Sequence, residues 1–384
     1  MLPLDDVLVV AVEQAVSAPH CTRQLADLGA RVIKVETGSG DFARHYDDVV
    51  HGTSAHFAWA NRGKESVALD LKSATGRAAV EELLARADVL VQNLAPGAAA
   101  RLGLDAAAAT ARHPRLVAVD ISGYGSGGPR SAGRAYDLLV QSEAGSCAIT
   151  GTGDTPAKPG VPLVDIGTGM VAANAILAAL LARTRTGTGA AISVAMFDVA
   201  TDWMGWVLNL ARFTGADPPR LGLSSFMVAP YGGYRTRDGQ VIVLGTTNDG
   251  EWRRLATHVL GRPDLADDAR YATNSDRLRR REELDTVIAA WVAEHTFGEA
   301  SRAAEQATIG WARLNTPLDV LDHPQLAQRD RWVDTGSPGG AFPSLRPPAE
   351  CADWDWSPGR VPATGEHTAD ILAELRTDND RPQP

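Results

Sequence analysis

The residue with the clearest chemical potential is Asp165, a lone carboxylate within the stretch Pro162–Met170. Gly167 and Gly169 follow it and leave room for a ligand or a backbone to approach closely. The next segment, 171–182, is uncharged, and the dipole of a helix starting here would keep the carboxylate ionised. Such a group can act as a base or as a nucleophile toward an activated acyl group. An aspartate before a helix is also a common N-cap, and this alternative stays open.

Several standard catalytic sites are missing from the sequence. It has no G-x-S-x-G, no H-E-x-x-H, no phosphate loop ending in Gly-Lys-Ser/Thr, and no G-x-G-x-x-G after its first strand. Cys21, Cys147 and Cys351 lie far apart without metal-ligand spacing. Hydrolase and metalloenzyme interpretations therefore weaken, and we expect no metal. An odd number of separated cysteines and an acidic N-terminus favour a reducing, cytoplasmic location.

Length and charge limit the class of protein further. The chain has 384 residues, of which 44% are hydrophobic and 22% charged, with a net charge of −10. This length predicts two domains, and the charge argues against nucleic-acid or anionic-membrane partners. The uncharged run 166–182 is short and rich in Gly and Ala. We therefore interpret it as a helix of a soluble core and not as a membrane span.

The elements that must position Asp165 read as alternating strands and helices. Hydrophobic runs predict a βαβ opening with strands at 7–12 and 31–36 around a helix at 20–28. The same alternation continues with strands at 66–70, 88–93, 116–121 and 190–196 and a helix at 73–87. This pattern predicts an α/β fold with a Rossmann-like parallel sheet. Ligands of such sheets bind beyond the carboxyl ends of the strands, where the turns 93–97 and 122–128 lie.

The pattern changes after residue 205. A β-hairpin is expected at 231–244 around Asp238-Gly239, followed by helices at 251–260 and 277–295. The second helix starts with Arg277, Arg279, Arg280 and Arg281, which we interpret as a solvated face paired with acids such as Glu282 and Glu283. We predict a discontinuous large domain of residues 1–205 and 330–384, and a small α+β domain of residues 206–329. The Pro- and Trp-rich segment 337–362 is expected to be an extended return.

Several blocks of sequence together resemble one known family, the class III CoA-transferases. This family contains formyl-CoA transferase, carnitine CoA-transferase and alpha-methylacyl-CoA racemase, and the resemblance covers nearly the whole chain. The matching blocks are Ala18-Pro19, Leu28–Glu36, Gly38-Ser39-Gly40-Asp41, Asn61–Ser66, Leu69–Lys72, Asn93–Gly97, Gly123-Tyr124-Gly125, Tyr136-Asp137, Asp165, Ala229-Pro230-Tyr231 and Gly365–Thr368.

The resemblance implies an interlocked, ring-like homodimer with CoA and acyl-CoA as substrates. It also implies that Asp165 is the catalytic aspartate, forming anhydride and aspartyl-CoA thioester intermediates. Backbone N–H groups near Ser17 or Gly167 are expected to stabilise the oxyanions. The residues that would contact CoA are Val16 and Ser17 at the thioester, Leu69 and Lys72 at the adenine and ribose, Asn93 and Leu94 at the pantetheine or adenine, Arg101 and Arg134 at the phosphates, and Tyr136.

Three departures from the family pattern narrow the expected reaction. A family arginine falls on Thr37, which puts one phosphate contact in doubt. The glycine-rich flap of formyl-CoA transferase has no counterpart between Trp206 and Tyr231. The racemase histidine is replaced by Tyr136, and a racemase needs bases on both faces of the alpha carbon. We therefore expect CoA transfer, with a small dicarboxylate as acceptor. A racemase and a non-catalytic CoA-binding protein remain as alternatives, and surface ion pairs remain an alternative role for Lys72, Arg101 and Arg134.

Overall fold

The computed structural model describes residues 1–379 and divides into two compact units. The large unit consists of Met1–Ser146, Pro159–Trp206 and the residues from Leu326 onward, and the small unit consists of Cys147–Lys158 and Val207–Gln325. The sequence analysis placed residues 147–158 in the large domain, whereas the structure groups them with the small unit. The large unit carries the cavity described below.

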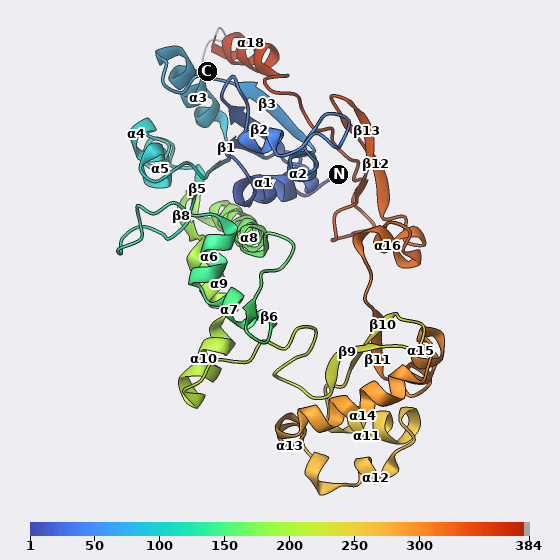
Figure 1. Ribbon diagram of the computed structural model, residues 1–384. Coiled ribbons are helices and arrows are strands. Elements are labelled where there is room, and N and C mark those ends of the chain that lie inside the picture. The colour runs from blue at the N-terminus through green and yellow to red at the C-terminus, as the bar shows by residue number, and fades with distance from the viewer. Residues whose placement is uncertain (380–384) are drawn as a thin grey trace. The chain divides into compact units, whose positions relative to one another are not determined.

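A six-stranded parallel sheet forms the centre of the large unit (Figure 1), in the order β3-β2-β1-β4-β5-β8. Strand β1 pairs with β2 on one side and β4 on the other, so that Val9 lies opposite both Val32 and Val89. The order of strands therefore reverses at β1, which is where open α/β sheets bind their ligands. The strands are β1 Leu8–Val12, β2 Arg31–Glu36, β3 Lys64–Ala68, β4 Val89–Gln92, β5 Val117–Ser122 and β8 Ala190–Ala195. The α/β prediction is confirmed.

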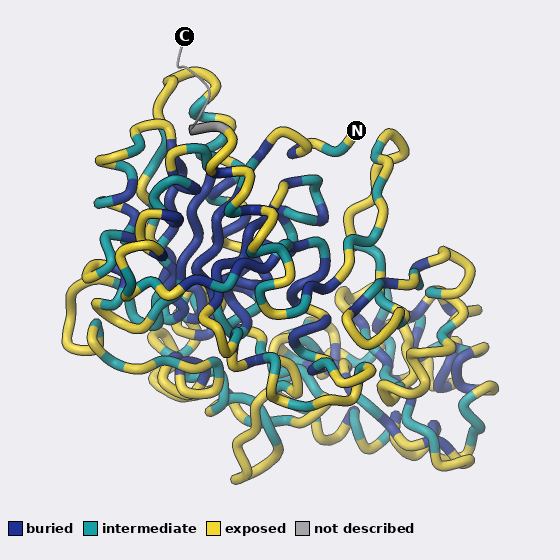
Figure 2. Tube along the Cα trace, turned by 90° about the horizontal axis from the view of Figure 1, so that it is seen from above, coloured by how far each residue is buried: buried dark blue, intermediate teal, exposed yellow. Residues whose placement is uncertain are grey.

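Helices cover both faces of this sheet. Alternate residues of each strand point to opposite faces and pack against different helices. Val9 packs with α1 (Ser17–Asp27), α8 (Leu163–Thr186) and α9 (Met196–Trp203). Val10 packs with α3 (Ala74–Arg86), α5 (Ala106–Arg112) and α18 (Thr368–Asn379). The sheet of the large unit accordingly corresponds to the densest group of buried, dark blue segments in Figure 2. This two-sided burial explains why the strands read as continuous apolar runs in the sequence.

Helix α18 lies beside α3 and β3, although nearly three hundred residues separate them in the chain (Figure 1). Its Ile371 and Leu375 are buried in the same core as α3. The N–H of Ser66 donates to His367 Nδ1 at 3.1 Å, and the N–H of Ala68 donates to Thr368 Oγ1 at 2.9 Å. The C-terminal part of the chain thus completes the β3 side of the large unit.

Helix α8 is the longest helix, and it is the one helix among the described residues that is long and apolar enough to cross a membrane. Its most apolar window is 44% buried. The buried side packs on α1 and on the sheet, as expected for a core helix, while Met170, Val171 and Leu181 remain exposed.

The small unit contains a three-stranded antiparallel sheet in the order β11-β10-β9. Strands β9 (Tyr231–Arg235) and β10 (Val241–Gly245) form the expected hairpin, and β11 (Gly310–Arg313) was not predicted. The helix expected at 277–295 is two helices, α13 (Asn274–Arg279) and α14 (Arg281–Ala293), because the backbone turns at Arg280.

Two more sequence expectations differ from the structure. The basic run pairs with neighbouring acids as expected, but with others than Glu282 and Glu283, since Arg279 lies 2.6 Å from Asp276 and Arg281 lies 3.5 Å from Asp285. Arg277 departs from the expected solvated face, because it is buried and bonds Asp249. The return segment expected at 337–362 begins within a two-stranded antiparallel sheet, formed by β12 (Trp332–Ser337) and β13 (Gly340–Leu345). The remaining elements are η1 Phe42–His45, α2 Ala55–Asn61, α4 Ala98–Leu102, α6 Asp137–Glu143, α7 Ser146–Ile149, β6 Gly151–Thr152, β7 Thr155–Pro156, α10 Gly205–Thr214, α11 Asp249–Arg254, η2 Leu255–Val259, α12 Pro263–Ala266, η3 Ala269–Tyr271, α15 Phe297–Gln306, α16 Pro317–Leu321, α17 Pro324–Ala327, β12 Trp332–Ser337 and β13 Gly340–Leu345.

Candidate active site

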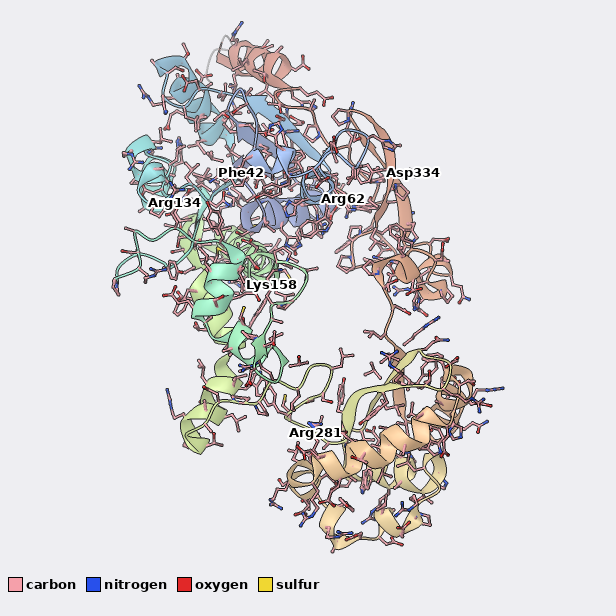
Figure 3. The ribbon with its side chains drawn as sticks, viewed as in Figure 1. Phe42, Arg62, Arg134, Lys158, Arg281 and Asp334 are labelled. Atoms are coloured by element: carbon pink, nitrogen blue, oxygen red, sulfur yellow. The ribbon has the colours of Figure 1, made fainter. Side chains whose placement is uncertain are left out.

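A cavity of about 580 Å³ lies at the carboxyl ends of β1, β4 and β5. Its walls include the loop after β1, the turn 93–97 after β4 and the turn that follows β5. Phe42 and Arg134, both labelled in Figure 3, also line it. The cavity therefore occupies the position that the strand order predicts for a ligand.

Asp165 lies in the wall of this cavity, in the first turn of α8. The Ser17 hydroxyl at the start of α1 donates to Asp165 Oδ1 at 2.7 Å. Asp165 does not cap the helix, since Asp137 on α6 takes that role. Asp137 Oδ1 accepts the N–H groups of Val164 at 2.9 Å and of Asp165 at 3.2 Å. The capping alternative is thus excluded, and the Asp165 carboxylate is left for a ligand.

Burial raises the pKa of Asp165 to about 6, and the nearby charge of Asp137 raises it as well, while the hydrogen bond from Ser17 lowers it. The carboxyl group is therefore mainly ionised at pH 7 and yet poorly hydrated. A poorly hydrated carboxylate in a cavity wall can attack an electrophilic carbonyl carbon.

The two glycines after Asp165 allow close packing of other elements. A Cβ on Gly167 would lie 1.8 Å from a ring carbon of Trp203, and a Cβ on Gly169 would lie 2.6 Å from the carbonyl oxygen of Ser17. Gly169 thus lets α1 approach α8, which brings the Ser17 hydroxyl to Asp165. Gly167 lies within α8, where the N–H of each residue bonds the carbonyl four residues earlier, so the expectation that it donates to an oxyanion is wrong.

A row of aromatic side chains lies close to Asp165 and was missed by the sequence analysis. Phe42 contacts Tyr46, Tyr46 contacts His56, and His56 contacts Trp59, with ring centroids 5.4 to 5.9 Å apart. Trp59 stacks on His20 at 5.2 Å. Burial lowers the pKa of His20 to about 4, so this ring is neutral at pH 7. Nothing in the spacing of these residues signals the row, because it forms only when α1, α2 and η1 come together.

The three cations expected to contact CoA, Lys72 at the adenine and ribose and Arg101 and Arg134 at the phosphates, are exposed. Among residues 1–379, Lys72, Arg101 and Arg134 have no carboxylate within ion-pair distance, so the surface ion-pair alternative finds no partners. Arg134 lines the cavity, and Arg101 on α4 lies beside Gly97 at its edge. Lys72 follows β3 and does not line the cavity. Thr37 is exposed, and its hydroxyl lies 2.9 Å from that of Ser39.

The other residues carried over from the resemblance fall into two groups. Asn93, Leu94 and Tyr136 line the cavity together with Ser17, Arg134 and Asp165. Val16 and Leu69 are each only 7% exposed and lie outside the lining, Val16 as the residue before α1 and Leu69 within the hydrophobic core. Asn93 also clamps the loop after β1, because its side chain accepts the Gln14 N–H at 2.9 Å and donates to the Gln14 carbonyl at 2.8 Å.

Two features of this region were not predicted. Asp137 belongs to the block Tyr136-Asp137, but its capping of α8 depends on the packing of α6. Lys34 lies on a central strand with no exposed surface, and it bonds Asp41 at 2.9 Å. The sequence did contain a signal for Lys34, because it is a charged residue between the apolar residues of a strand. Among the described residues, no group of three His, Cys, Asp or Glu side chains is placed to hold a metal ion.

Comparisons with known proteins agree on one family. Residues 4–368 match CoA-transferase family III. The chain is 33% identical to the succinate–glutarate CoA-transferase of Agrobacterium fabrum over 98% of this chain and 96% of that protein. It is 34% identical to the acetyl-CoA:oxalate CoA-transferase of Acetobacter aceti over 87% of this chain and 86% of that protein.

A solved structure supports the same assignment. The crystal structure of a CAIB/BAIF family protein from Brucella suis matches with a TM-score of 0.83 and 34% identity, covering 97% of this chain and 99% of that one. The chain thus belongs to CoA-transferase family III.

Proposed function

We propose that this protein moves CoA from a donor acyl-CoA to a free carboxylic acid through covalent intermediates on Asp165. The observation that carries the proposal is the Asp165 carboxylate, which lies in the cavity wall and is freed from capping by Asp137. Among the side chains of the described residues, only the Ser17 hydroxyl bonds it. The unpaired cations Arg101 and Arg134 suit the phosphates of CoA.

The reaction balances in four steps. Asp165 attacks the thioester carbonyl of the donor and releases CoA thiolate, which leaves a mixed anhydride. The thiolate attacks the aspartyl carbonyl, releasing the donor acid and leaving an aspartyl-CoA thioester. The acceptor carboxylate displaces the thiolate to form a second anhydride. The thiolate then attacks the acceptor's carbonyl carbon, so that the new acyl-CoA leaves and Asp165 is regenerated.

A small dicarboxylate is the proposed acceptor. Proteins of similar sequence are named for the acids they use, and these include glutarate, oxalate, D-citramalate and mesaconate. A racemase needs a second base across the alpha carbon. Tyr136 stands where the resemblance would require a histidine, and His20 does not line the cavity. Transfer is therefore favoured over racemisation.

We also propose that the protein is an interlocked homodimer. Met170, Val171 and Leu181 of α8 and Leu138 and Leu139 of α6 are 39–63% exposed, which leaves apolar surface on the large unit for a second copy to cover. Analytical ultracentrifugation should give twice the chain mass of 40.6 kDa. A monomer would exclude the dimer without affecting the proposed chemistry.

The test of function is mass spectrometry of CoA esters. The enzyme is mixed in deuterated water with succinyl-CoA or acetyl-CoA and a panel of acids that contains succinate, glutarate, oxalate, mesaconate and citramalate. New acyl-CoA species are expected with the wild type and not with Asp165→Ala or the isosteric Asp165→Asn. Deuterium at the alpha carbon without a new ester would instead establish a racemase. CoA binding without either reaction would leave a binding protein.

The covalent route has its own test. With an acceptor acid labelled by ¹⁸O in both carboxylate oxygens, each turnover should transfer one ¹⁸O to the carboxylate of Asp165, while the departing donor acid takes one Asp165 oxygen with it. The peptide that contains Asp165 should therefore gain about 2 Da after a single turnover and about 4 Da after many turnovers. Labelled product without labelled Asp165 would contradict covalent catalysis.

The pH dependence should follow the Asp165 carboxyl group. Because burial raises its pKa to about 6, protonation removes the nucleophile below that pH. We expect kcat/KM to fall about tenfold per pH unit below pH 6 and to be level above it. A rate that stays constant down to pH 4.5 would contradict this assignment.

A further inference from the structure

The loop between β1 and α1, Glu13–Ser17, is both a wall of the cavity and the source of the hydroxyl that bonds Asp165. Ala15 in this loop has a φ of 61°. This left-handed conformation is unfavourable for a residue with a Cβ. The surrounding structure must therefore impose it.

Asp41 makes the contact that can impose this conformation. The Ala15 N–H donates to Asp41 Oδ1 at 3.2 Å, and the same oxygen accepts the Ala43 N–H at 3.0 Å. The other oxygen, Oδ2, accepts from Lys34 Nζ at 2.9 Å. Gly40, with a φ of 77°, forms the turn that brings Asp41 back beneath the loop. Asp41 thus joins the loop to a charged side chain of β2.

The start of the loop is held by the same cluster. Glu13 Oε1 lies 3.4 Å from Lys34 Nζ and accepts from Lys64 Nζ at 2.7 Å, while its Oε2 accepts from the Thr22 hydroxyl at 2.7 Å. Neither lysine side chain has exposed surface. Two buried cations therefore hold the loop at Glu13 and, through Asp41, at Ala15.

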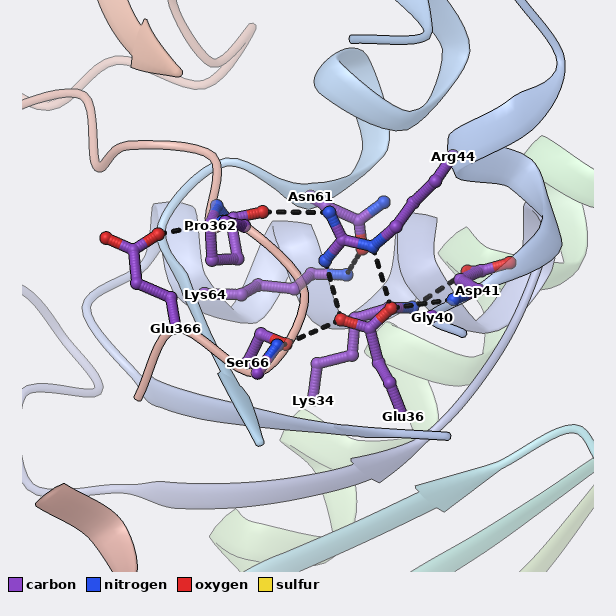
Figure 4. Close-up of polar contacts among 12 residues, drawn as sticks. Lys34, Glu36, Gly40, Asp41, Arg44, Asn61, Lys64, Ser66, Pro362 and Glu366 are labelled. Carbon is purple, nitrogen blue, oxygen red and sulfur yellow. Dashed lines mark hydrogen bonds and ion pairs between the residues drawn. The ribbon is translucent and has the colours of Figure 1, made fainter. Parts of the chain in front are cut away.

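The cluster is balanced in charge, as Figure 4 shows for most of its members. It contains three carboxylates and three cations, which are Glu13, Glu36, Asp41, Lys34, Arg44 and Lys64. None of the six lines the cavity. An effect of the cluster on the reaction must therefore act through a neighbouring segment that does line the cavity, which is the loop at Ala15 or Phe42 in the helix that Asp41 caps.

We propose that Asp41, held by Lys34, is a positioning residue for CoA transfer: it fixes Ala15 in the left-handed conformation and thereby keeps the Ser17 hydroxyl on Asp165. The proposal rests on the proposed function, because Asp165 is taken as the nucleophile. It assigns the buried cluster a role in the reaction, although no member of the cluster touches the substrate.

The test compares Asp41→Ser with Asp41→Asn. Serine still caps η1 at Ala43 but is too short to reach Ala15, whereas asparagine keeps an acceptor for both N–H groups. Asp27→Ala is the control, since Asp27 is also buried and forms two hydrogen bonds with Arg62, but forms no hydrogen bond or ion pair with the described residues 13–16. Each variant is measured for kcat/KM against pH and for amide hydrogen exchange in residues 13–17.

The groups that set the titration of Asp165 are Ser17 and Asp137, with Tyr46 and His20 close by. In Asp41→Ser the Ser17 hydrogen bond should loosen. We then expect kcat/KM to fall 10- to 100-fold, its acid limb to move up by about half a pH unit, and the loop to exchange at least tenfold faster. Asp41→Asn should restore most of each value, and Asp27→Ala should change neither the acid limb nor the loop exchange.

Two outcomes would overturn the proposal. One is a loop in Asp41→Ser that exchanges as slowly as in the wild type. The other is an Asp27→Ala variant with the same shift of the acid limb. If Asp41→Ser does not fold, fast exchange of residues 13–17 in the wild-type protein would contradict the proposal. If the wild type transfers no CoA, the proposed function fails, while the exchange comparison still shows whether Asp41 holds the loop.

Discussion

Two regions of the molecule place buried cations beneath a loop, and they satisfy those cations differently. In the large unit, Lys34 and Lys64 bond carboxylates that have no exposed surface. In the small unit, Arg277 is 1% exposed and donates mainly to backbone carbonyls, those of Ala229 at 2.7 Å and Tyr271 at 3.0 Å. Its carboxylate partner within residues 1–379, Asp249, is 55% exposed.

The difference shows that the kind of partner decides how costly the loss of a buried cation is. Removing Lys34 leaves the buried carboxylate of Asp41 without its cation, although Glu13 keeps Lys64, and an uncompensated buried charge is costly. Removing Arg277 leaves neutral carbonyls and a carboxylate that water can solvate. The stability of the large unit beneath the Glu13–Ser17 loop therefore depends on charge balance, whereas the contact of Arg277 with Ala229 depends on the fork shape of guanidinium.

The largest expected effect is the loss of stability when each buried cation is removed. Without a difference between the two losses, the comparison of the two units would fail. Lys34→Met should lower the free energy of unfolding by about 3–5 kcal/mol, and Arg277→Met by about 1–3 kcal/mol. Urea unfolding followed by hydrogen exchange in peptides of each unit measures both. Equal losses in the two variants would show that the kind of partner does not matter.

The next largest effect is that low pH should destabilise the large unit more than the small unit. The Arg44 guanidinium holds the pKa of Glu36 at about 2, below its ordinary value of 4.5, although burial opposes the shift. The unfolded chain then binds this proton more readily than the folded one. The stabilisation is fully present above pH 4.5 and is lost as the pH falls toward 2, by about 3 kcal/mol for this group. Between pH 4.5 and 2, pepsin should cut the large unit before the small unit, and the reverse order would contradict the comparison.

Packing at α8 provides a third test. A Cβ on Gly167 meets the rigid ring of Trp203, so Gly167→Ala should lower the free energy of unfolding by about 2 kcal/mol. Thermal unfolding measures the loss. Adding Trp203→Leu should recover part of the stability, because it removes the clashing ring. A double variant no more stable than Gly167→Ala would show that the clash is not the cause.

The smallest expected effect has the opposite sign. Gly298 in α15 of the small unit has open space where a Cβ would be. Gly298→Ala should therefore raise the free energy of unfolding by about 0.5 kcal/mol, since alanine restricts the unfolded chain and favours the helix. Urea unfolding beside Gly167→Ala checks the contrast, and a loss at Gly298 would contradict it.

An element of this fold could be predicted from the sequence only where its own residues carry a distinct apolar pattern. Strand β2 was predicted with its observed ends, because a buried parallel strand reads as an apolar run between turn residues. Strand β11 is exposed throughout, so it has no apolar periodicity and was missed. The break at Arg280 was missed because apolar spacing continues across it.

The residues of the candidate site likewise divide into those with a local signal in the sequence and those that depend on tertiary packing. Asp165 was found because its local sequence is unusual, and the turn 93–97 was found because strand order dictates where ligands bind. The partnership of Lys34 with Asp41 could not be predicted, since it requires a turn at Gly40 and the pairing of β1 with β2. The capping of α8 by Asp137 likewise depends on tertiary packing.

The position of α18 has a consequence for synthesis on the ribosome. The residues that complete the β3 side of the sheet, Ile371 and Leu375, are made only after the whole small unit, which ends at Gln325. The small unit can bury its own core while the chain is still growing, whereas β3 must wait with its apolar side uncovered. Translation thus gives the two units a fixed order of completion, in which the unit that carries Asp165 is finished last.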